Sequence, residues 1–403
     1  MPVERASLPK RVLRVGQVRT ANRAAVLRLL RRHRQLSRAE LARRTGLSEA
    51  AISRIIADLM AEDLLVEFGH SPATGGRPGV TLQLNERRFR AVGADISEWE
   101  TRLALGTATG RTLASDRFRT PGPPGETLAR LAEHLERIVA ESDEPPAGIG
   151  ISTRGIVDSR TGTVELGPHP AWVNIGIRRY LAERIGIPIY VENNVRAAAL
   201  AEYVYGSADI RGIHCLLFLI VATGIGMAIV LDGKMYTGPR MSAGELGQMV
   251  IEHSNGPERH DRPGCVERLV SDLATWDRYC ALAGERPPAT PVGGQQMRQV
   301  CRLAMEGDRA ARGALAETSK YLGIAIANAV WAMDAEAVVI EGTITEAWPL
   351  VSAGIREQFP EGPEFVNFRN LVLRPSLLGG EGSLTGVMTL PFASMFSPDG
   401  ALV

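Results

Sequence analysis

The sequence of 403 residues is poor in cysteine, in aromatic residues and in net charge, and each shortage excludes a class of protein. Its four cysteines, Cys215, Cys265, Cys280 and Cys301, are scattered and include no C-x-x-C pair. This argues against a disulfide framework and indicates a reducing, cytoplasmic environment. Arginines interrupt residues 1–23, where a signal peptide would have its apolar segment, so we expect no secretion signal.

Long apolar runs are also scarce. The only long uncharged stretch, Cys215–Leu231, is divided by Gly224 and Gly226 into two pieces of strand length. Because a membrane-spanning helix needs about 20 predominantly apolar residues, the stretch predicts a buried hairpin, and we expect no membrane partner. The content of 45% hydrophobic and 23% charged residues is typical of globular proteins, and the length predicts two or three domains.

The formal net charge of +1 is the sum of two opposite halves. Residues 1–90 contain 18 Lys and Arg against 8 Asp and Glu, a net charge of +10. The remainder contains 28 against 37, a net charge of −9. The sum argues against a nucleic-acid partner, but the distribution predicts a basic binding unit attached to an acidic body.

Three short helices are indicated near the N-terminus. Residues 21–45 show helical periodicity, with Val26, Leu29 and Leu30 as one apolar stripe. Ser37 with Glu40 forms a capping box that opens a second helix, Arg38–Thr45. Gly46 is placed to end that helix in the left-handed conformation, and Ser48 is placed to cap a third helix. The inward stripe of the third helix is expected to comprise Ile52, Ile55, Ile56 and Leu59.

Two helices joined by a tight turn predict a helix-turn-helix, and a hairpin at Leu65–Phe68 and Val80–Leu84 adds a wing. The alternative is an ordinary helical hairpin, but the basic charge favours DNA. The side chains expected to face DNA are Ser48, Glu49, Ser53, Arg54 and Arg77. Arg54 is the candidate for a guanine contact, while both serines could equally bind phosphates. Arg77, in the turn Ser71–Gly79, either enters the minor groove or remains a solvated loop residue.

After Asn85 the pattern becomes α/β, and one arrangement of three strands occurs twice. The predicted strands are Ala91–Ile96, Arg102–Thr107 and Thr112–Thr120, and then Leu216–Val221, Met227–Leu231 and Lys234–Thr237. The turns Thr109-Gly110 and Asp232-Gly233 occupy matching places. This duplication predicts two similar lobes with a cleft between them, where a small ligand would bind.

Several short motifs in this region make the interpretation more specific. They are Gly148-Ile-Gly-Ile-Ser152, Glu192-Asn-Asn-Val-Arg-Ala-Ala-Ala-Leu-Ala-Glu202, Ala222-Thr-Gly-Ile-Gly226, Leu231-Asp-Gly-Lys234, Ala243-Gly-Glu-Leu-Gly247, Gly264-Cys-Val-Glu267 and Tyr321-Leu-Gly. In order and spacing they resemble the ROK family of repressors, uncharacterised open reading frames and sugar kinases. With its N-terminal helices, nearly the whole chain resembles the transcriptional repressors of that family.

The resemblance implies an α/β fold in which a winged helix-turn-helix, residues 1–86, precedes a two-lobed, actin-like (ribonuclease H-like) body, residues 87–403. The first lobe is expected at about residues 87–205 and the second at about residues 206–382. A final helix, about Ser383–Ser394, is expected to return to the first lobe.

The same resemblance separates kinases from repressors. Family kinases have an Asp-x-Gly-Gly-Thr phosphate turn where this chain has Asp95-Ile96-Ser97-Glu98-Trp99, so that Glu98 adds negative charge and Trp99 is expected to fill space. They have Asn-Asp where this chain has Asn193-Asn194, and an amide cannot accept the proton of a sugar hydroxyl. We therefore expect no catalytic residues and no kinase activity.

The positions of the family's structural zinc site hold Gln248, Glu258, His260 and Cys265. Glutamine is not a normal zinc ligand, so no metal or other cofactor is assigned, although the last three residues could form a reduced site. An ordinary polar loop is the alternative.

The positions that contact sugar in the family hold Asn193, Asn194, Glu245, Gln248 and Glu267. Two interpretations stay open, a pocket for another sugar or sugar derivative and a vestigial pocket. The two asparagines are also placed to cap the helix that starts near Val195.

The sequence thus predicts a repressor of carbohydrate-metabolism genes that forms a homodimer, or a tetramer, on an inverted-repeat DNA operator and responds to a sugar. A regulator controlled instead by a partner protein, and an active sugar kinase, are the alternatives.

Overall fold

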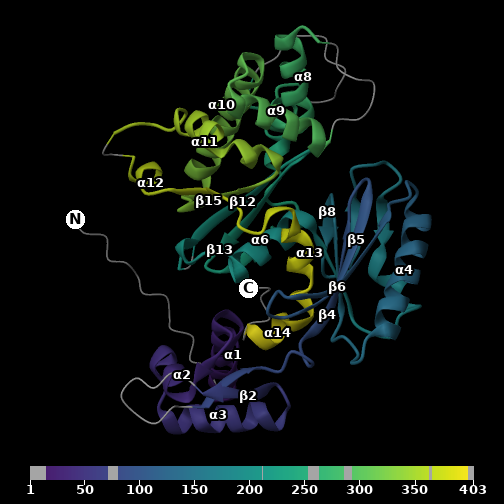
Figure 1. The fold of residues 1–403 in the computed structure, drawn as a ribbon, viewed down its shortest axis with the longest axis vertical. Coiled ribbons are helices and arrows are strands. Elements are labelled where there is room, and N and C mark those ends of the chain that lie inside the picture. The colour runs from purple at the N-terminus through teal and green to yellow at the C-terminus, as the bar shows by residue number, and fades with distance from the viewer. Residues whose placement is uncertain are drawn as a thin grey trace.

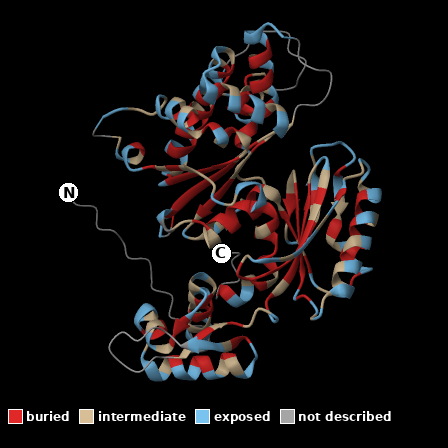
Figure 2. Ribbon diagram, in the orientation of Figure 1, coloured by how far each residue is buried: buried red, intermediate tan, exposed pale blue. Residues whose placement is uncertain are grey.

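The computed structural model describes residues 15–70, 80–210, 212–252, 263–285, 293–362 and 365–397. They form a small N-terminal head and a body built around two five-stranded sheets (Figure 1). Buried residues gather in the sheets and on the inner faces of the helices, and exposed residues cover the outer helix faces (Figure 2). The predicted classes, a winged helix and an α/β actin-like body, are both present.

The head contains three helices and a three-stranded sheet in the order β1-β3-β2. Its elements are α1 Val15–His33, β1 Leu36–Ser37, α2 Arg38–Thr45, α3 Glu49–Ala61, β2 Leu65–His70 and β3 Val80–Leu84. The local signals are confirmed, since the Ser37–Glu40 capping box is complete and Gly46 has φ 71°. The predicted inward stripe of α3 is buried. The predicted turn between β2 and β3 lies outside the described residues.

The first lobe has a sheet in the order β11-β7-β4-β5-β6. Its strands are β4 Arg90–Ile96, β5 Glu100–Thr107, β6 Thr112–Arg119, β7 Ile149–Thr153 and β11 Ile189–Asn193. Helices α4 Pro124–Glu141, α5 Ile177–Ala182 and α6 Asn194–Tyr205 accompany it, as does a second small sheet of β8 Ile156–Asp158, β9 Thr163–Leu166 and β10 Val173–Gly176. The sequence did not reveal this second sheet, because its strands are short and mostly exposed.

The second lobe repeats the first. Its sheet, β16-β15-β12-β13-β14, follows the same order of antiparallel and parallel neighbours. The strands are β12 Cys215–Val221, β13 Ile225–Leu231, β14 Lys234–Tyr236, β15 Ala337–Glu341 and β16 Val372–Pro375. Its helices are α7 Val266–Val270, α8 Asp272–Ala283, α9 Gly294–Glu306, α10 Arg309–Met333, α11 Trp348–Arg356 and α12 Val366–Arg369. The short 3-10 turns are η1 Ala208–Ile210, η2 Leu246–Gln248 and η3 Thr343–Ala347.

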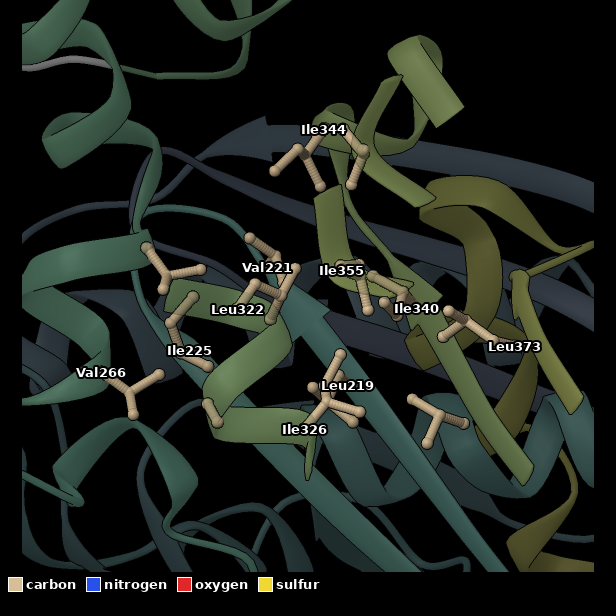
Figure 3. Packing of buried hydrophobic residues seen from close by; sticks show 14 of the residues in the cluster. Leu219, Val221, Ile225, Val266, Leu322, Ile326, Ile340, Ile344, Ile355 and Leu373 are labelled. Carbon is tan, nitrogen blue, oxygen red and sulfur yellow. The ribbon is translucent and has the colours of Figure 1, made fainter. Parts of the chain in front are cut away.

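The apolar run Cys215–Leu231 forms the antiparallel hairpin of β12 and β13, as predicted. Leu219, Val221 and Ile225 from this hairpin pack against Leu322 and Ile326 of α10 in the core of the lobe (Figure 3). None of the described helices combines the length and apolar character needed to cross a membrane. All four cysteines are buried free thiols.

The C-terminal segment consists of η4 Gly379–Glu381, α13 Gly382–Val387, η5 Leu390–Phe392 and α14 Ala393–Phe396. The expectation of one continuous helix over Ser383–Ser394 is wrong, because Pro391 lacks the N–H that a helix interior requires. The helix α13 packs between α6 and the first sheet (Figure 1). A Cβ at Gly386 would lie 1.8 Å from the carbonyl oxygen of Ala197, so glycine permits this approach.

The last turn, α14, leaves the body and lies against α1 of the head. The rings of Phe392 and Phe396 pack on Phe89 with centroid distances of 5.5 and 5.7 Å. All three side chains are buried in one apolar cluster with the core of the head. The end of the chain is therefore part of the joint between head and body.

Candidate nucleic-acid interface and interlobe site

The exposed face of α3 lies on the side of the head away from the body (Figure 1). Ser48 caps this helix, and its Oγ accepts a hydrogen bond of 3.3 Å from the Ala51 N–H. The four described residues predicted to face DNA, Ser48, Glu49, Ser53 and Arg54, are all exposed. The fifth, Arg77, lies outside the described residues.

Two salt bridges hold α3 against α1. Arg19 contacts Asp58 at 2.7 Å, and Arg23 contacts Glu62 at 2.5 Å. The bond from Arg23 lowers the pKa of Glu62 and raises that of Arg23 itself. These pairs hold Asp58 and the C-cap residue Glu62 toward α1. Arg54 is the one basic residue of α3, and it is exposed.

The turn between β4 and β5 takes the place of the family's phosphate turn. Asp95 accepts hydrogen bonds from Arg102 at 2.8 Å and from the Ser152 hydroxyl at 2.6 Å. Glu98 forms a salt bridge of 3.6 Å with Arg154. The expectation that Trp99 fills space is wrong, since Trp99 is 50% exposed. The turn thus presents a carboxylate and no glycine.

Asn193 is the N-cap of α6. Its Oδ1 accepts hydrogen bonds from the N–H groups of Val195 and Arg196 at 2.9 and 3.1 Å, and its Nδ2 donates to the Gly155 carbonyl at 2.9 Å. The predicted capping role is confirmed for Asn193, while the half-buried Asn194 is the first residue of the helix. The two lone pairs of Oδ1 are thus occupied, and Nδ2 uses one of its two hydrogens, so one N–H of this side chain remains available for a ligand.

A buried ion pair connects the first lobe to the loop before η2. Arg196 lies 2.6 Å from Glu192 and donates to the carbonyls of Val157 at 2.7 Å and of Met241 at 2.9 Å. Both charged side chains are almost fully buried. This arrangement holds the start of α6 and the segment that contains Glu245 in a fixed relation.

Glu267 of α7, in the second lobe, binds the start of β13 close to the N-terminus of α6. Its carboxylate accepts a hydrogen bond of 3.0 Å from the Ile225 N–H. Partial desolvation raises the pKa of the exposed Glu245, the Glu267 carboxylate raises it further, and Arg196 opposes both. Gln248 is exposed at the end of η2, and Gly247 beside it packs on Glu267. The structure thus brings Glu245 and Glu267 near one another and near the N-terminus of α6.

Of the four positions considered for zinc, the structure describes Cys265 and Gln248. Cys265 is buried at the N-cap of α7, and Glu258 and His260 lie outside the described residues. In the part of the chain that is described, no three His, Cys, Asp or Glu side chains are grouped so as to hold a metal ion.

The sequence did not predict a set of interacting charged residues on β4, β5, β15 and η4. Arg102 joins Asp95 to Glu381 of η4, which it contacts at 2.9 Å. Burial raises the pKa of Glu341, at the end of β15, to about 8, with Asp95 and Glu202 adding to the effect. An acidic residue directly after four apolar strand residues was the only available signal, and it does not reveal the partners.

A model of the ROK family matches residues 91–390, which is most of the chain. The chain belongs to the ROK family. Residues 19–77 in addition match a model of the MarR family.

This ROK chain is 26% identical to the xylose repressor of Caldicellulosiruptor bescii over 386 residues, covering 93% of this chain and 96% of the relative. It is similar to the crystal structure of a ROK family transcriptional regulator, a homologue of the E. coli MLC protein, with a TM-score of 0.76 and 25% identity over 96% and 98% of the two chains. A ROK family glucokinase from Streptomyces griseus, in complex with glucose and AMPPNP, shares the fold of the body. In that case the TM-score is 0.63 and the identity 21%, covering 75% of this chain and 98% of the kinase.

Proposed function

We propose that this ROK protein is a DNA-binding transcriptional regulator that represses carbohydrate-metabolism genes and is released or modulated by a sugar or sugar derivative. The exposed face of α3, with Arg54 on a head of net charge +10, carries the proposal. A recognition helix in a winged helix-turn-helix enters the major groove, and basic charge supplies the phosphate attraction. Similarity along nearly the whole length to a xylose repressor supports the carbohydrate assignment.

We assign DNA binding to residues 1–86 and effector binding to residues 87–403. Ser48, Glu49, Ser53 and Arg54 are the proposed DNA contacts on α3, and Arg77 is the proposed contact from the wing. Two heads in a homodimer would read the half-sites of an inverted repeat, because the two-fold axis of the protein then matches that of the DNA.

The proposed sugar site lies at the junction of the lobes and comprises Asn193, Asn194, Glu245, Gln248 and Glu267. Amide and carboxylate groups bind neighbouring sugar hydroxyls in pairs, and the remaining N–H of Asn193 is one such donor. A sugar there shifts the regulator only if it prefers the arrangement that does not bind DNA, with typical couplings of about 1–3 kcal/mol.

Loss of kinase activity is part of the proposal. The carboxylate of Glu98 replaces the glycine-rich surface that a phosphate would need, and Asn194 cannot act as a general base. Each replacement alone should prevent catalysis, because binding of ATP and activation of the sugar hydroxyl are separate requirements.

The test begins with selection of a preferred duplex from a random DNA pool, followed by anisotropy titrations of the full chain. We expect tight binding to the selected duplex that falls steeply with added salt, and weakening by at least one member of a panel of sugars. The Glu267→Gln variant keeps an acceptor for the Ile225 N–H but should lose the sugar response. Glu306→Gln, on the exposed surface of α9, is the matched control. Absence of sequence preference would refute the proposal.

A regulator whose sugar site is vestigial is the second candidate. The observation in its favour is that both lone pairs of Asn193 Oδ1 are already occupied within the chain. Calorimetry that detects no binding of any sugar or sugar phosphate, together with sequence-specific DNA binding, would favour this candidate and control by a partner protein.

A further inference from the structure

The guanidinium of Arg154 lies where the two lobes meet. Arg154 directly follows β7, the strand beside β4, and its side chain is 29% exposed. A Cβ at Gly224, in the turn between β12 and β13, would lie 3.0 Å from Arg154 Nη2 and 2.8 Å from Glu267 Oε2. Arg154 of the first lobe therefore contacts the second lobe directly beside a residue of the proposed sugar site.

Arg154 also pairs with the turn between β4 and β5. Its Nη1 lies 3.6 Å from Glu98 Oε2, and half of the Glu98 side chain is exposed. The turns that contain Glu98 and Gly224 connect equivalent strands of the two repeated sheets. One guanidinium thus lies against both turns, one from each lobe.

The pair of Arg154 with Glu98 is loose. The neighbouring pair of Arg196 with Glu192 has a length of 2.6 Å. A charge-assisted hydrogen bond is about 2.7–2.9 Å long, so Arg154 and Glu98 attract one another without forming such a bond. Pairs with an exposed partner contribute little to stability, so another anion can displace the Glu98 carboxylate.

The backbone places Arg154 next to a second residue of the sugar site. The carbonyl of the following residue, Gly155, accepts the 2.9 Å hydrogen bond from Asn193 Nδ2. Arg154 is therefore adjacent to the anchor of Asn193 along the chain and to Glu267 in space. A sugar that binds Asn193 and Glu267 brings its substituents within reach of the guanidinium.

We propose that Arg154 binds an anionic group of the effector, so that the sugar recognised by this protein is acidic and carries a carboxylate or a phosphate. This assignment rests on the sugar site proposed above and names the class of its ligand. A guanidinium presents paired donors that match the geometry of carboxylate and phosphate oxygens. In the free protein the Glu98 carboxylate occupies the place of the anionic group, and the effector displaces it.

Glu245 and Glu267 determine how such a ligand lies. Carboxylates repel an anion, but they accept hydrogen bonds from sugar hydroxyls. The hydroxyls are therefore expected on the two glutamates and the acidic group on Arg154. This division of roles selects one orientation of the sugar.

The test is calorimetry of the full chain without DNA. The probes are D-glucose, D-galactose, D-mannose and D-xylose, each compared with its sugar acid and with its phosphate ester. We expect at least one acid or ester to bind about tenfold more tightly than its neutral parent, the effect of one additional charge-assisted contact. The comparison of acids with esters identifies whether the group on Arg154 is a carboxylate or a phosphate.

Two variants separate the proposed roles. Arg154→Gln should remove the preference for the acidic sugar and leave binding of the neutral parent unchanged. Glu98→Gln should tighten binding of the acidic sugar, because the competing carboxylate is gone, and a gain of affinity cannot result from misfolding. Arg117→Gln and Glu100→Gln are the matched controls, since these residues form an ion pair of the same length, 3.6 Å, between β6 and β5. Both controls should behave as the wild type does.

Four outcomes would overturn the proposal. They are equal affinities for neutral and acidic sugars, equal weakening of both by Arg154→Gln, acidic-sugar binding in Glu98→Gln no tighter than in Glu100→Gln, and no binding of any probe. After any of the first three, release from the selected duplex by a neutral sugar still supports the proposed regulator. Absence of sequence preference for DNA would refute the regulator without changing a calorimetric preference for the acidic sugar, so the two proposals fail separately.

Discussion

Arg28 donates a hydrogen bond of 2.6 Å to the carbonyl oxygen of Phe396, 368 residues further along the chain. Arg31, one turn later, stacks on the ring of the same phenylalanine. The last described helical turn therefore connects the head to the body through both its backbone and its side chain. A small number of contacts at this joint determines how the head is held.

Phe396→Ala should loosen the head from the body. Phe396 is 3% exposed, and removal of a buried phenylalanine costs about 3–5 kcal/mol. We expect calorimetric unfolding to split, with the head melting separately at a lower temperature. Met395→Ala, whose side chain is 41% exposed on the same turn, should leave a single transition. Equal effects of the two changes would contradict the assigned role of Phe396.

Gly386→Ala should destabilise the body strongly. A Cβ there would overlap the Ala197 carbonyl at 1.8 Å, and neither backbone can move without separating α13 from α6. We expect the free energy of unfolding in urea to fall by about 1–3 kcal/mol, the typical cost of overpacking. Gly380→Ala, where a Cβ meets nothing within 4 Å, should be tolerated. A stable Gly386→Ala protein would show that the two helices pack less closely than described.

Glu341→Gln should remove a pH dependence of stability. The pKa of Glu341 is raised to about 8 by burial and by Asp95 and Glu202, from an ordinary value of 4.5. The unfolded chain therefore ionises first, and the stabilisation from the neutral side chain is complete below pH 4.5 and is lost as the pH rises to about 8. We expect urea midpoints of the wild type to fall across this window by an amount that the variant does not show. Glu346→Gln, at an exposed residue of η3, should retain the wild-type slope.

Arg54→Ala should reduce sequence preference rather than overall affinity. A bidentate contact to guanine discriminates by about 1–3 kcal/mol, so the variant should select a duplex that is degenerate at one position per half-site. The measurement is the ratio of affinities for the selected duplex and for random DNA. If both affinities fall by the same factor, Arg54 contacts a phosphate.

Asn194→Asp should not produce a sugar kinase. The aspartate would restore a general base, but the turn at Glu98 would still lack a surface for the phosphates of ATP. A coupled assay for ADP release with a panel of hexoses should detect no turnover in the wild type or the variant. Turnover in either protein would show that the phosphate site is functional.

Local features of this protein could be predicted from the sequence because they depend on neighbouring residues. The capping box of Ser37 and Glu40, the left-handed Gly46 and the N-cap at Ser48 each follow from a spacing of a few positions. The strand hairpins followed from alternation and turn residues. The doubled order of strands then predicted two similar α/β lobes, since each lobe uses the same local pattern, and the actin-like fold class followed from the family resemblance.

The candidate sites were predictable only as lists of residue types. Nothing local in the sequence shows that Arg102 bridges Asp95 and Glu381, or that Glu341 is buried beside them. Pro391 in the sequence was a signal that the final helix is interrupted, but no signal indicated the contact of Phe396 with the head. Its partners are on α1, at the other end of the chain.

The sequence by itself determined the division of charge, the helix-turn-helix and the two α/β lobes, because composition, spacing and capping act over short distances along the chain. Only the tertiary structure decided which arginines of α1 pair with acidic residues at α3 and which contact the end of the chain. Arg19 and Arg28 are the same residue type on one helix, and their environments differ because α3 covers one part of that helix and the end of the chain covers the other.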